Sequence, residues 1–217
     1  MAMKKKYVVF GVDRFGAAVA RTLEKGGSQV IAVDIDPAKI QQIAEDVSYA
    51  MTADVLDPEA IEGLGLKNID GAVITMVDHM EASIVSAMTC VDRHFPYILA
   101  RAKNEVHGRI LEKIGVDRIV YPEQEMGTRV GKFMDDRDFM DWIELSPEYS
   151  LVEVRVPEEW VGKTLTQLNL RRTCSFNVVG LKDEDGIIVT PDPDMPLTAN
   201  LMMYIIGHNA DLEKIKQ

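Results

Sequence analysis

A glycine-containing turn near the amino terminus constrains this chain more than any other feature. Residues 4–10, which end in the apolar residues 7–10, predict a buried strand, and the turn Gly11-Val12-Asp13-Arg14-Phe15-Gly16 follows directly. A second apolar run, residues 29–33, leads into Asp34. A glycine turn that opens a helix, followed about 20 residues later by an acidic strand end, is the pattern of a nucleotide-binding βαβ unit. We therefore expect the turn to hold phosphate groups and Asp34 to bind ribose hydroxyls.

Asp13 departs from this pattern. It stands where a second glycine usually lets the backbone approach the pyrophosphate, and it places a carboxylate beside a polyanion. Four arrangements accommodate it: the carboxylate turns away, pairs with Arg14, acts through a cation, or accompanies phosphates in an altered position. Arg14 offers forked donors to phosphate oxygens and would neutralise Asp13 when no ligand is bound. A solvated surface arginine is the alternative interpretation.

Composition limits the classes of function. The chain has 217 residues, of which 47% are hydrophobic, so one ordinary domain and one small domain can each bury a core. The net charge of −11 leaves no basic face for nucleic acid or anionic lipid. No apolar segment long enough for a signal peptide or a membrane span follows the amino-terminal lysines, so we expect a cytoplasmic protein without direct membrane insertion. Cys90 and Cys174 lack a zinc or disulfide spacing and are expected to be small buried hydrophobic residues.

Strand and helix patterns alternate over roughly the first 120 residues, which is typical of a doubly wound parallel sheet in the α/β class. We predict a Rossmann-like domain over residues 1–123. Strand ends fall at Asp34, at Ala53-Asp54, after the apolar run 72–77, and at Arg101. Because the carboxyl ends of parallel strands share one edge of the sheet, ligands are expected to bind there.

The pattern changes after Pro122. Residues 124–143 predict one amphipathic helix with an apolar stripe of Met126, Val130, Phe133 and Met134, which suggests packing on a partner. Residues 146–148 predict a linker. Residues 149–217 predict a small α+β domain whose modest size favours a dimer with a shared core.

The motifs together resemble the regulatory subunits of bacterial Trk/Ktr potassium uptake systems, the RCK proteins with KTN (TrkA-N) and TrkA-C domains. The resemblance covers essentially the whole chain. The sequence features that carry it are the G-x-D-R-F-G turn, Asp34, Ala53-Asp54, the run Ile114-Gly-Val-Asp-Arg-Ile-Val-Tyr-Pro-Glu123, Gly162-Lys-Thr-Leu165, Pro191-x-Pro193 and Ile206-Gly207. Of these, the Ile114–Glu123 run is the sharpest.

The resemblance implies a cytoplasmic gating ring rather than an enzyme. Dimers joined through a crossover or dimerisation helix, residues 124–145, assemble into a homo-octamer on a membrane-embedded subunit that conducts potassium. ATP and ADP, or NAD and NADH, bind the amino-terminal lobes, and cyclic di-AMP binds the carboxyl-terminal lobes of some members. Arg171, Asn177 and Pro191 lie where such contacts would fall, although Arg171 would equally suit a solvated helix end.

The resemblance also assigns candidate ligand contacts. The expected nucleotide-binding residues are Gly11, Val12, Asp13, Arg14, Phe15, Gly16, Asp34, Ile35, Asp36, Lys39, Ala53, Asp54, Val55, Thr75, Met76 and Arg101. Asp36 would equally serve as a helix N-cap, and Met76 as ordinary core. Glu123 is expected to reach the terminal phosphates of a neighbouring subunit through Mg²⁺ or Ca²⁺, because its carboxylate would otherwise be repelled. A glutamate that merely begins a helix is the alternative.

The alternative class of function is an NAD-dependent oxidoreductase. The four histidines have no serine or cysteine partner at a motif spacing, and the chain contains no Tyr-x-x-x-Lys pair. The small second domain and Asp13 also argue against a dehydrogenase. A scaffold whose site has lapsed is a third interpretation, and Asp13 is its main support.

Overall fold

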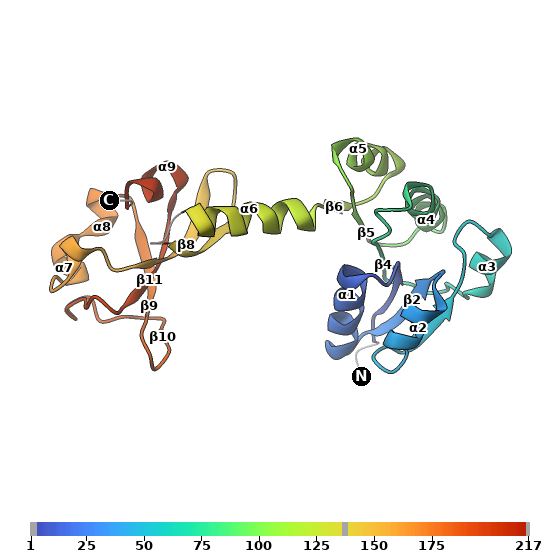
Figure 1. Cartoon of the computed structure of the whole chain (residues 1–217), viewed down its shortest axis with the longest axis horizontal. Coiled ribbons are helices and arrows are strands. Elements are labelled where there is room, and N and C mark those ends of the chain that lie inside the picture. Colours follow the sequence, from blue (N-terminus) through green and yellow to red (C-terminus); the bar gives the residue numbers. More distant parts are fainter. Residues whose placement is uncertain (1–3, 136–138, 216–217) are drawn as a thin grey trace. The chain divides into compact units, whose positions relative to one another are not determined.

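The computed structural model describes residues 4–135 and 139–215 and divides into two compact units, residues 1–122 and residues 123–217 (Figure 1). Each unit has its own sheet and its own hydrophobic core. Within the described residues, none of the helices combines the length and the apolar character needed to cross a bilayer.

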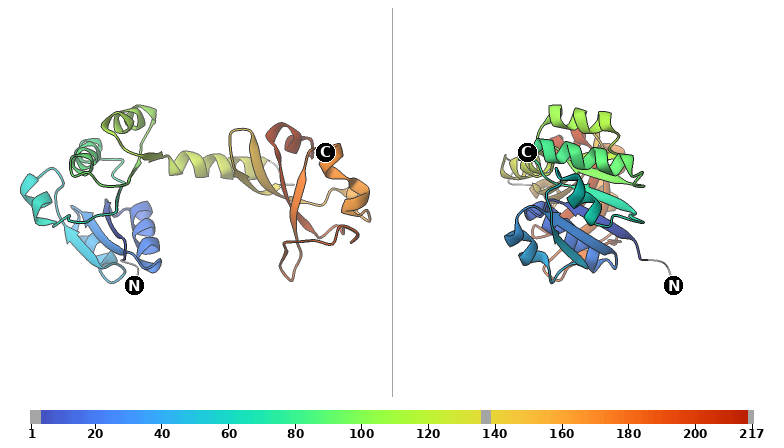
Figure 2. Two further views of the ribbon diagram at one scale, coloured as in Figure 1. Left: turned by 180° about the vertical axis from the view of Figure 1, so that it is seen from behind. Right: turned by 90° about the vertical axis from the view of Figure 1, so that its right-hand side faces the viewer.

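The first unit is built on a six-stranded parallel sheet with strand order β3-β2-β1-β4-β5-β6 (Figures 1 and 2). Its strands are β1 (Lys6–Phe10), β2 (Gln29–Asp34), β3 (Tyr49–Thr52), β4 (Gly71–Ile74), β5 (Ile98–Arg101) and β6 (Arg118–Val120). Its helices are α1 (Arg14–Lys25), α2 (Pro37–Ile43), α3 (Pro58–Gly63), α4 (Met80–Asp92) and α5 (Glu105–Ile114). This order is that of a doubly wound sheet and confirms the predicted fold class.

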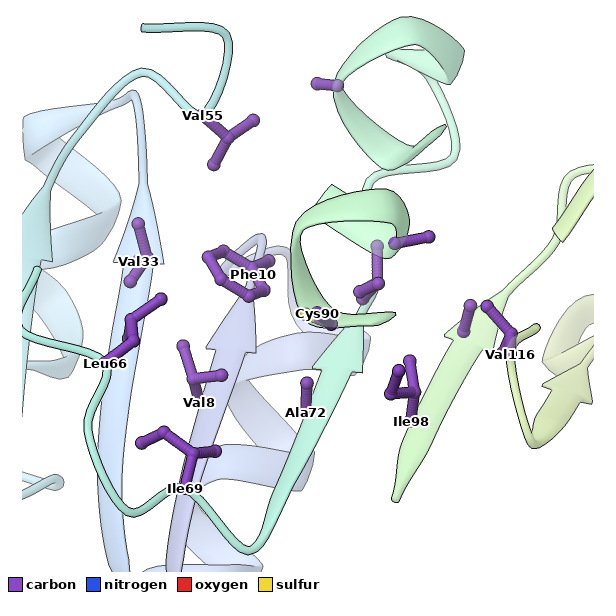
Figure 3. Packing of buried hydrophobic residues seen from close by; sticks show 14 of the residues in the cluster. Val8, Phe10, Val33, Val55, Leu66, Ile69, Ala72, Cys90, Ile98 and Val116 are labelled. Carbon is purple, nitrogen blue, oxygen red and sulfur yellow. The ribbon is translucent and has the colours of Figure 1, made fainter. Parts of the chain in front are cut away.

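Helices cover both faces of this sheet because successive strand residues point to opposite sides. Val8 and Phe10 of β1 face a core built with α3, α4 and α5, whereas Val9 faces the core formed with α1 and α2. Figure 3 shows the first of these cores, with Phe10 between Val33 and the helix that carries Cys90. Burial on both faces accounts for the continuous apolar runs in the sequence.

The thiol of Cys90 behaves as expected for a core residue. Its side chain is fully buried, and this burial raises the pKa of the thiol to about 12. The thiol therefore stays protonated at neutral pH and contributes packing rather than reactivity. Cys174 is partly buried, and both cysteines are free.

The second unit contains a five-stranded sheet, order β10-β9-β11-β8-β7, with antiparallel pairing throughout. Its elements are α6 (Pro122–Asp135), β7 (Phe139–Glu144), β8 (Tyr149–Arg155), a 3-10 turn (Glu158–Trp160), α7 (Leu165–Leu168), α8 (Leu170–Thr173), β9 (Asn177–Lys182), β10 (Ile187–Ile188), β11 (Met202–His208), α9 (Asn209–Leu212) and a second 3-10 turn (Glu213–Ile215). The alternating burial of β8 and β11 packs one face of the sheet against these short helices. This is the small α+β domain that the sequence predicts.

The predicted helix over residues 124–143 is wrong at residues 139–143, and residues 136–138 lie outside the described part of the structure. Helix α6 ends at Asp135, and residues 139–144 form strand β7, which pairs antiparallel with β8. Trp142 explains the difference, because its side chain is buried in the core of the second unit and is placed there by strand pairing. An ion pair between Arg129 of α6 and Asp141 of β7 lowers the pKa of the Asp141 carboxyl, chiefly through the hydrogen bond between them.

The predicted linker at residues 146–148 is instead the hairpin turn between β7 and β8. The backbone N–H of Ser146 donates to the carbonyl of Tyr149 at 3.1 Å, and the N–H of Tyr149 donates back at 3.3 Å. Pro147 suits such a turn because its fixed φ angle favours the corner. The chain is therefore hydrogen-bonded across the segment in which the sequence suggested a domain boundary.

Matched truncations of the two cores should act separately. Leu111→Ala in the first unit and Leu181→Ala in the second each remove a fully buried side chain, and each should cost about 2–5 kcal/mol of unfolding free energy in its own unit. Differential scanning calorimetry of the full chain should show each variant shifting a different part of the unfolding transition. Identical shifts of the whole transition by both variants would contradict separate cores.

Candidate functional site

A cavity of about 470 Å³ opens at the carboxyl ends of β1, β2, β3 and β4, where the strand order reverses between β1 and β4. Its lining comprises Gly11, Asp13, Asp34, Ile35, Lys39, Ala53, Asp54, Val55, Leu56, Thr75, Met76, Val77, Asp78, His79, Met80, Glu81 and Ala82. The point at which the strand order reverses is where open α/β sheets bind their ligands. Chain topology alone therefore brings these segments to one place.

The turn after β1 can be made only with glycine at two positions. Gly11 has φ +93°, and a Cβ atom there would lie 2.5 Å from Thr75 Oγ1. A Cβ atom on Gly16 would collide with the carbonyl oxygen of Gly11. Close packing of the turn against the start of α1 thus excludes side chains at both positions. The sequence-based role of these glycines in shaping the turn agrees with this geometry.

Thr75 holds the same turn from the side of β4. Its hydroxyl donates to the carbonyl of Gly11 at 2.9 Å, and the carbonyl of Phe10 lies at 3.2 Å. The strand predicted over residues 72–77 ends earlier, at Ile74, so that Thr75, Met76 and Val77 leave the sheet and line the cavity. Thr75 is fully buried, which makes it part of the support beneath the cavity.

Asp13 is fixed by two donors. Its Oδ1 accepts a hydrogen bond from the N–H of Gly16 at 2.9 Å, which makes Asp13 the N-cap of α1, and its Oδ2 pairs with Nη1 of Arg101. The guanidinium carbon of Arg101 also lies 5.6 Å from the centroid of the Phe15 ring. The expectation that Arg14 neutralises Asp13 is therefore corrected: the cation comes from the end of β5. Arg14 is exposed at the first position of α1.

Asp34 connects the two strand ends. Its side chain is buried, and it accepts hydrogen bonds from the N–H of Val12 at 2.7 Å, the N–H of Asp36 at 2.9 Å and Nζ of Lys39 at 3.4 Å. A carboxylate offers about four acceptor positions, so a fourth donor such as a ribose hydroxyl can still be accommodated. Because Asp34 also lines the cavity, it faces the space that a ligand would enter.

The structure gathers ten of the sequence-predicted residues around the cavity. These ten are Gly11, Asp13, Asp34, Ile35, Lys39, Ala53, Asp54, Val55, Thr75 and Met76. The remaining nucleotide candidates lie beside it or support it: Val12 and Gly16 through their N–H groups, Asp36 as the N-cap of α2, Phe15 and Arg101 behind Asp13, and Arg14 on the surface.

Sequence reasoning missed one wall of the cavity. Leu56 and residues 77–82 line it, and they were not among the candidates. A usable signal existed, because Val77-Asp78-His79 follows the apolar run that forms β4, and strand ends of a parallel sheet share one edge.

Glu123 lies outside this cavity, in the first turn of α6 and in the second unit. Glu123 is exposed. Among residues 4–135 and 139–215, no group of three histidine, cysteine, aspartate or glutamate side chains is arranged to hold a metal ion.

A doubly wound sheet with a glycine turn, a buried acidic residue at the end of β2 and a cavity between them defines a Rossmann-type ligand-binding domain, joined here to a small α+β domain. A model described as the TrkA-N domain matches residues 7–122, and one described as the TrkA-C domain matches residues 151–217. The chain belongs to the TrkA-N family and carries a TrkA-C domain.

Two similar proteins, matched over nearly their whole length, are named potassium uptake proteins. Ktr system potassium uptake protein C of Bacillus subtilis (strain 168) is 31% identical over 99% of this chain and 97% of its own length. Ktr system potassium uptake protein A of Vibrio alginolyticus is 32% identical over 94% of this chain and 92% of its own.

Solved structures support the fold. The crystal structure of the GsuK RCK domain aligns with 99% of this chain at a TM-score of 0.66 and 18% identity, and the chain spans 47% of that protein. A structure described as the GsuK channel bound to NAD gives a TM-score of 0.66 at 17% identity, with 99% of this chain and 39% of the channel chain covered. At these identities the likeness establishes the fold alone.

Gly16→Ala should destabilise the first unit by about 2 kcal/mol or more, because the added methyl meets the backbone of Gly11. Urea denaturation followed by circular dichroism measures this change. Gly127→Ala in α6 is the matched control, since a Cβ atom there meets nothing within 4 Å and alanine favours a helix over glycine. Equal effects of the two substitutions would refute the tight turn.

Proposed function

We propose that this chain is a nucleotide-sensing regulatory subunit of a potassium uptake system and has no chemistry of its own. The observation that carries the proposal is the cavity between the Gly11–Gly16 turn and the buried Asp34 carboxylate. The full-length similarity to two Ktr potassium uptake proteins supports the transport context. The ligand is an adenine nucleotide, ATP and ADP or NAD and NADH, and the GsuK channel described as bound to NAD supports this class.

Each part of the ligand has a proposed contact. The ribose hydroxyls bind Asp34, whose negative charge would repel a 2′-phosphate and so disfavours NADP. The adenine edge lies against Ala53, Asp54 and Val55, which line the cavity at the end of β3. Arg14 reaches the terminal phosphates from the first position of α1, where its exposed side chain is available to a ligand.

Regulation would follow if the nucleotide bound with different affinity to two shapes of the proposed octameric ring. A ligand moves such an equilibrium only by the difference in its binding free energy between the two states. A swing from mostly closed to mostly open needs about 5 kcal/mol. Shared among the eight coupled sites of an octamer, this is well under 1 kcal/mol at each site.

The proposed assembly is a homodimer joined through α6 that builds a homo-octamer on a membrane-embedded Trk/Ktr subunit at the inner face of the cell membrane. Met126, Val130 and Met134 are exposed at a spacing of four residues, which places them along one stripe of α6. The side chain of Phe133 lies outside the described part of the structure. Residues 124–135 therefore keep the proposed dimerisation role, whereas β7 belongs to the second sheet.

Two ligand proposals are finer. Glu123 would join a neighbouring subunit's nucleotide through Mg²⁺ or Ca²⁺, which its exposure in the first turn of α6 permits. Cyclic di-AMP would bind the second unit near a cavity of about 330 Å³ lined in part by Arg171 and Asn177. The guanidinium of Arg171 donates to Asn177 Oδ1 at 2.9 Å, so these two side chains are already positioned together.

Arg14→Ala should abolish discrimination between ATP and ADP in Mg²⁺ buffer while leaving the ribose contact in place. Isothermal titration calorimetry of wild type and variant with both nucleotides measures this discrimination. Arg21→Ala is the matched control, because Arg21 lies on the same helix and pairs with Asp46 at 2.6 Å, outside the cavity lining. Loss of discrimination in both variants would show a general charge effect. Failure of ATP, ADP, NAD and NADH alike to bind wild type would overturn the proposed function.

Val130→Glu should break the dimer, because it places a charge in the exposed apolar stripe of α6. Thr128→Glu introduces a glutamate at another exposed position of α6. Thr128 is two residues away from Val130 in the sequence and therefore lies on a different side of the helix, so this variant should leave assembly intact. Size-exclusion chromatography with light scattering compares the masses of the two variants. Dimers of normal mass from Val130→Glu would exclude α6 as the contact.

A further inference from the structure

The Asp13 carboxylate already engages the kind of donors that a phosphate would use. One of its oxygens accepts from the N–H of Gly16 in the first turn of α1, and the other pairs with the guanidinium of Arg101. Helix amino-terminal N–H groups and arginine forks are the usual donors to phosphate oxygens. The side chain of Asp13 thus occupies an anion position formed by the turn and the end of β5.

The arrangement is built into the domain rather than free at its surface. Arg101 is 8% exposed and lies against the Phe15 ring, whereas the side chain of Asp13 is 39% exposed and lines the cavity. Asp13 therefore stands between the ligand space and the buried cation. A phosphate entering the turn meets the carboxylate before it can share Arg101.

The cavity lining as a whole does not offset the negative charge of Asp13. Five carboxylates line the cavity, from Asp13, Asp34, Asp54, Asp78 and Glu81, and Lys39 is the lysine of the lining. Lys103, from outside the lining, pairs with Asp78 at 3.4 Å, so the carboxylates still outnumber the ammonium groups. Lys39 is already directed to Asp34, with Nζ 3.4 Å from its Oδ2. Because few positively charged groups lie around the cavity, each additional negative charge on a phosphate should meet net repulsion near the turn.

We propose that Asp13 is the specificity-determining residue of the site and acts as an internal phosphate mimic that selects against uncompensated phosphate charge. The inference rests on the proposed nucleotide function and deepens it. Phosphates gain the donors held by Asp13 only by displacing its carboxylate, or when a divalent cation lies between the two anions. Adenosine, which has no phosphate, does not compete with Asp13.

Asp13→Asn tests this directly, because asparagine keeps an N-cap acceptor for Gly16 but removes the charge. Adenosine, AMP, ADP and ATP are titrated into the full chain by calorimetry, in buffer with EDTA and again with excess Mg²⁺. In EDTA, the variant should bind ATP about tenfold more tightly than wild type or better, with a smaller gain for AMP and none for adenosine. Excess Mg²⁺ should narrow the difference between wild type and variant.

Two further variants secure the result. Asp46→Asn also removes one carboxylate charge from the first unit, but Asp46 pairs with Arg21 and does not line the cavity. This variant should leave the affinity for ATP unchanged. Asp13→Gly repeats the test should asparagine impair folding, because glycine is also accepted at a helix N-cap. Melting temperatures confirm that each variant is folded.

The outcomes separate this inference from the function on which it rests. Equal gains for ATP and adenosine, an ATP gain in Asp46→Asn, or unchanged ATP binding in both Asp13 variants would overturn the role of Asp13 alone. Wild type and all variants failing to bind these four ligands, and NAD and NADH titrated in the same way, would overturn the proposed function together with the inference.

Discussion

The hydrogen bond from the N–H of Val12 to the buried carboxylate of Asp34 is the contact on which the rest of the site depends. It ties the turn after β1 to the end of β2, and the same carboxylate orders the start of α2 through Asp36. A buried charge is tolerated only when donors satisfy it, and here two backbone N–H groups and an ammonium do so. With the turn held in this way, α1 begins at the edge of the cavity, and Thr75 closes the turn from beneath.

The first unit was largely predictable because its signals are local. Alternating strand and helix patterns, helix-capping aspartates followed by proline, and the acidic end of β2 each report on structure within a few residues. The pairing of Asp13 with Arg101 was not predictable in the same way, since the partners lie 88 residues apart and meet only when β5 joins the sheet. Strand β7 was missed because its apolar residues also suit a helix, and only pairing with β8 decides between the two.

The two units carry different features that a sensing subunit would need. The first supplies a cavity whose walls come from four strand ends, so a ligand there would touch segments that are distant in the sequence. The second supplies α6 with an exposed apolar stripe and a separate antiparallel sheet with its own core. A change of ligand in the first would act on a ring only if the same chain also contributed the contacts that hold neighbours together. The described residues include the cavity in the first unit and the exposed apolar stripe of α6 in the second.

The pairing of Asp13 with Arg101 also limits which single substitutions the protein can tolerate at these two positions. Losing the arginine alone would leave the partly exposed Asp13 carboxylate without its counter-ion. Losing the aspartate alone would leave a nearly covered guanidinium facing the ligand space. Aspartate and glycine codons differ by a single base, so a change to glycine at position 13 needs one mutation, yet its tolerance depends on the residue at position 101. The two positions should therefore covary among descendants of this lineage.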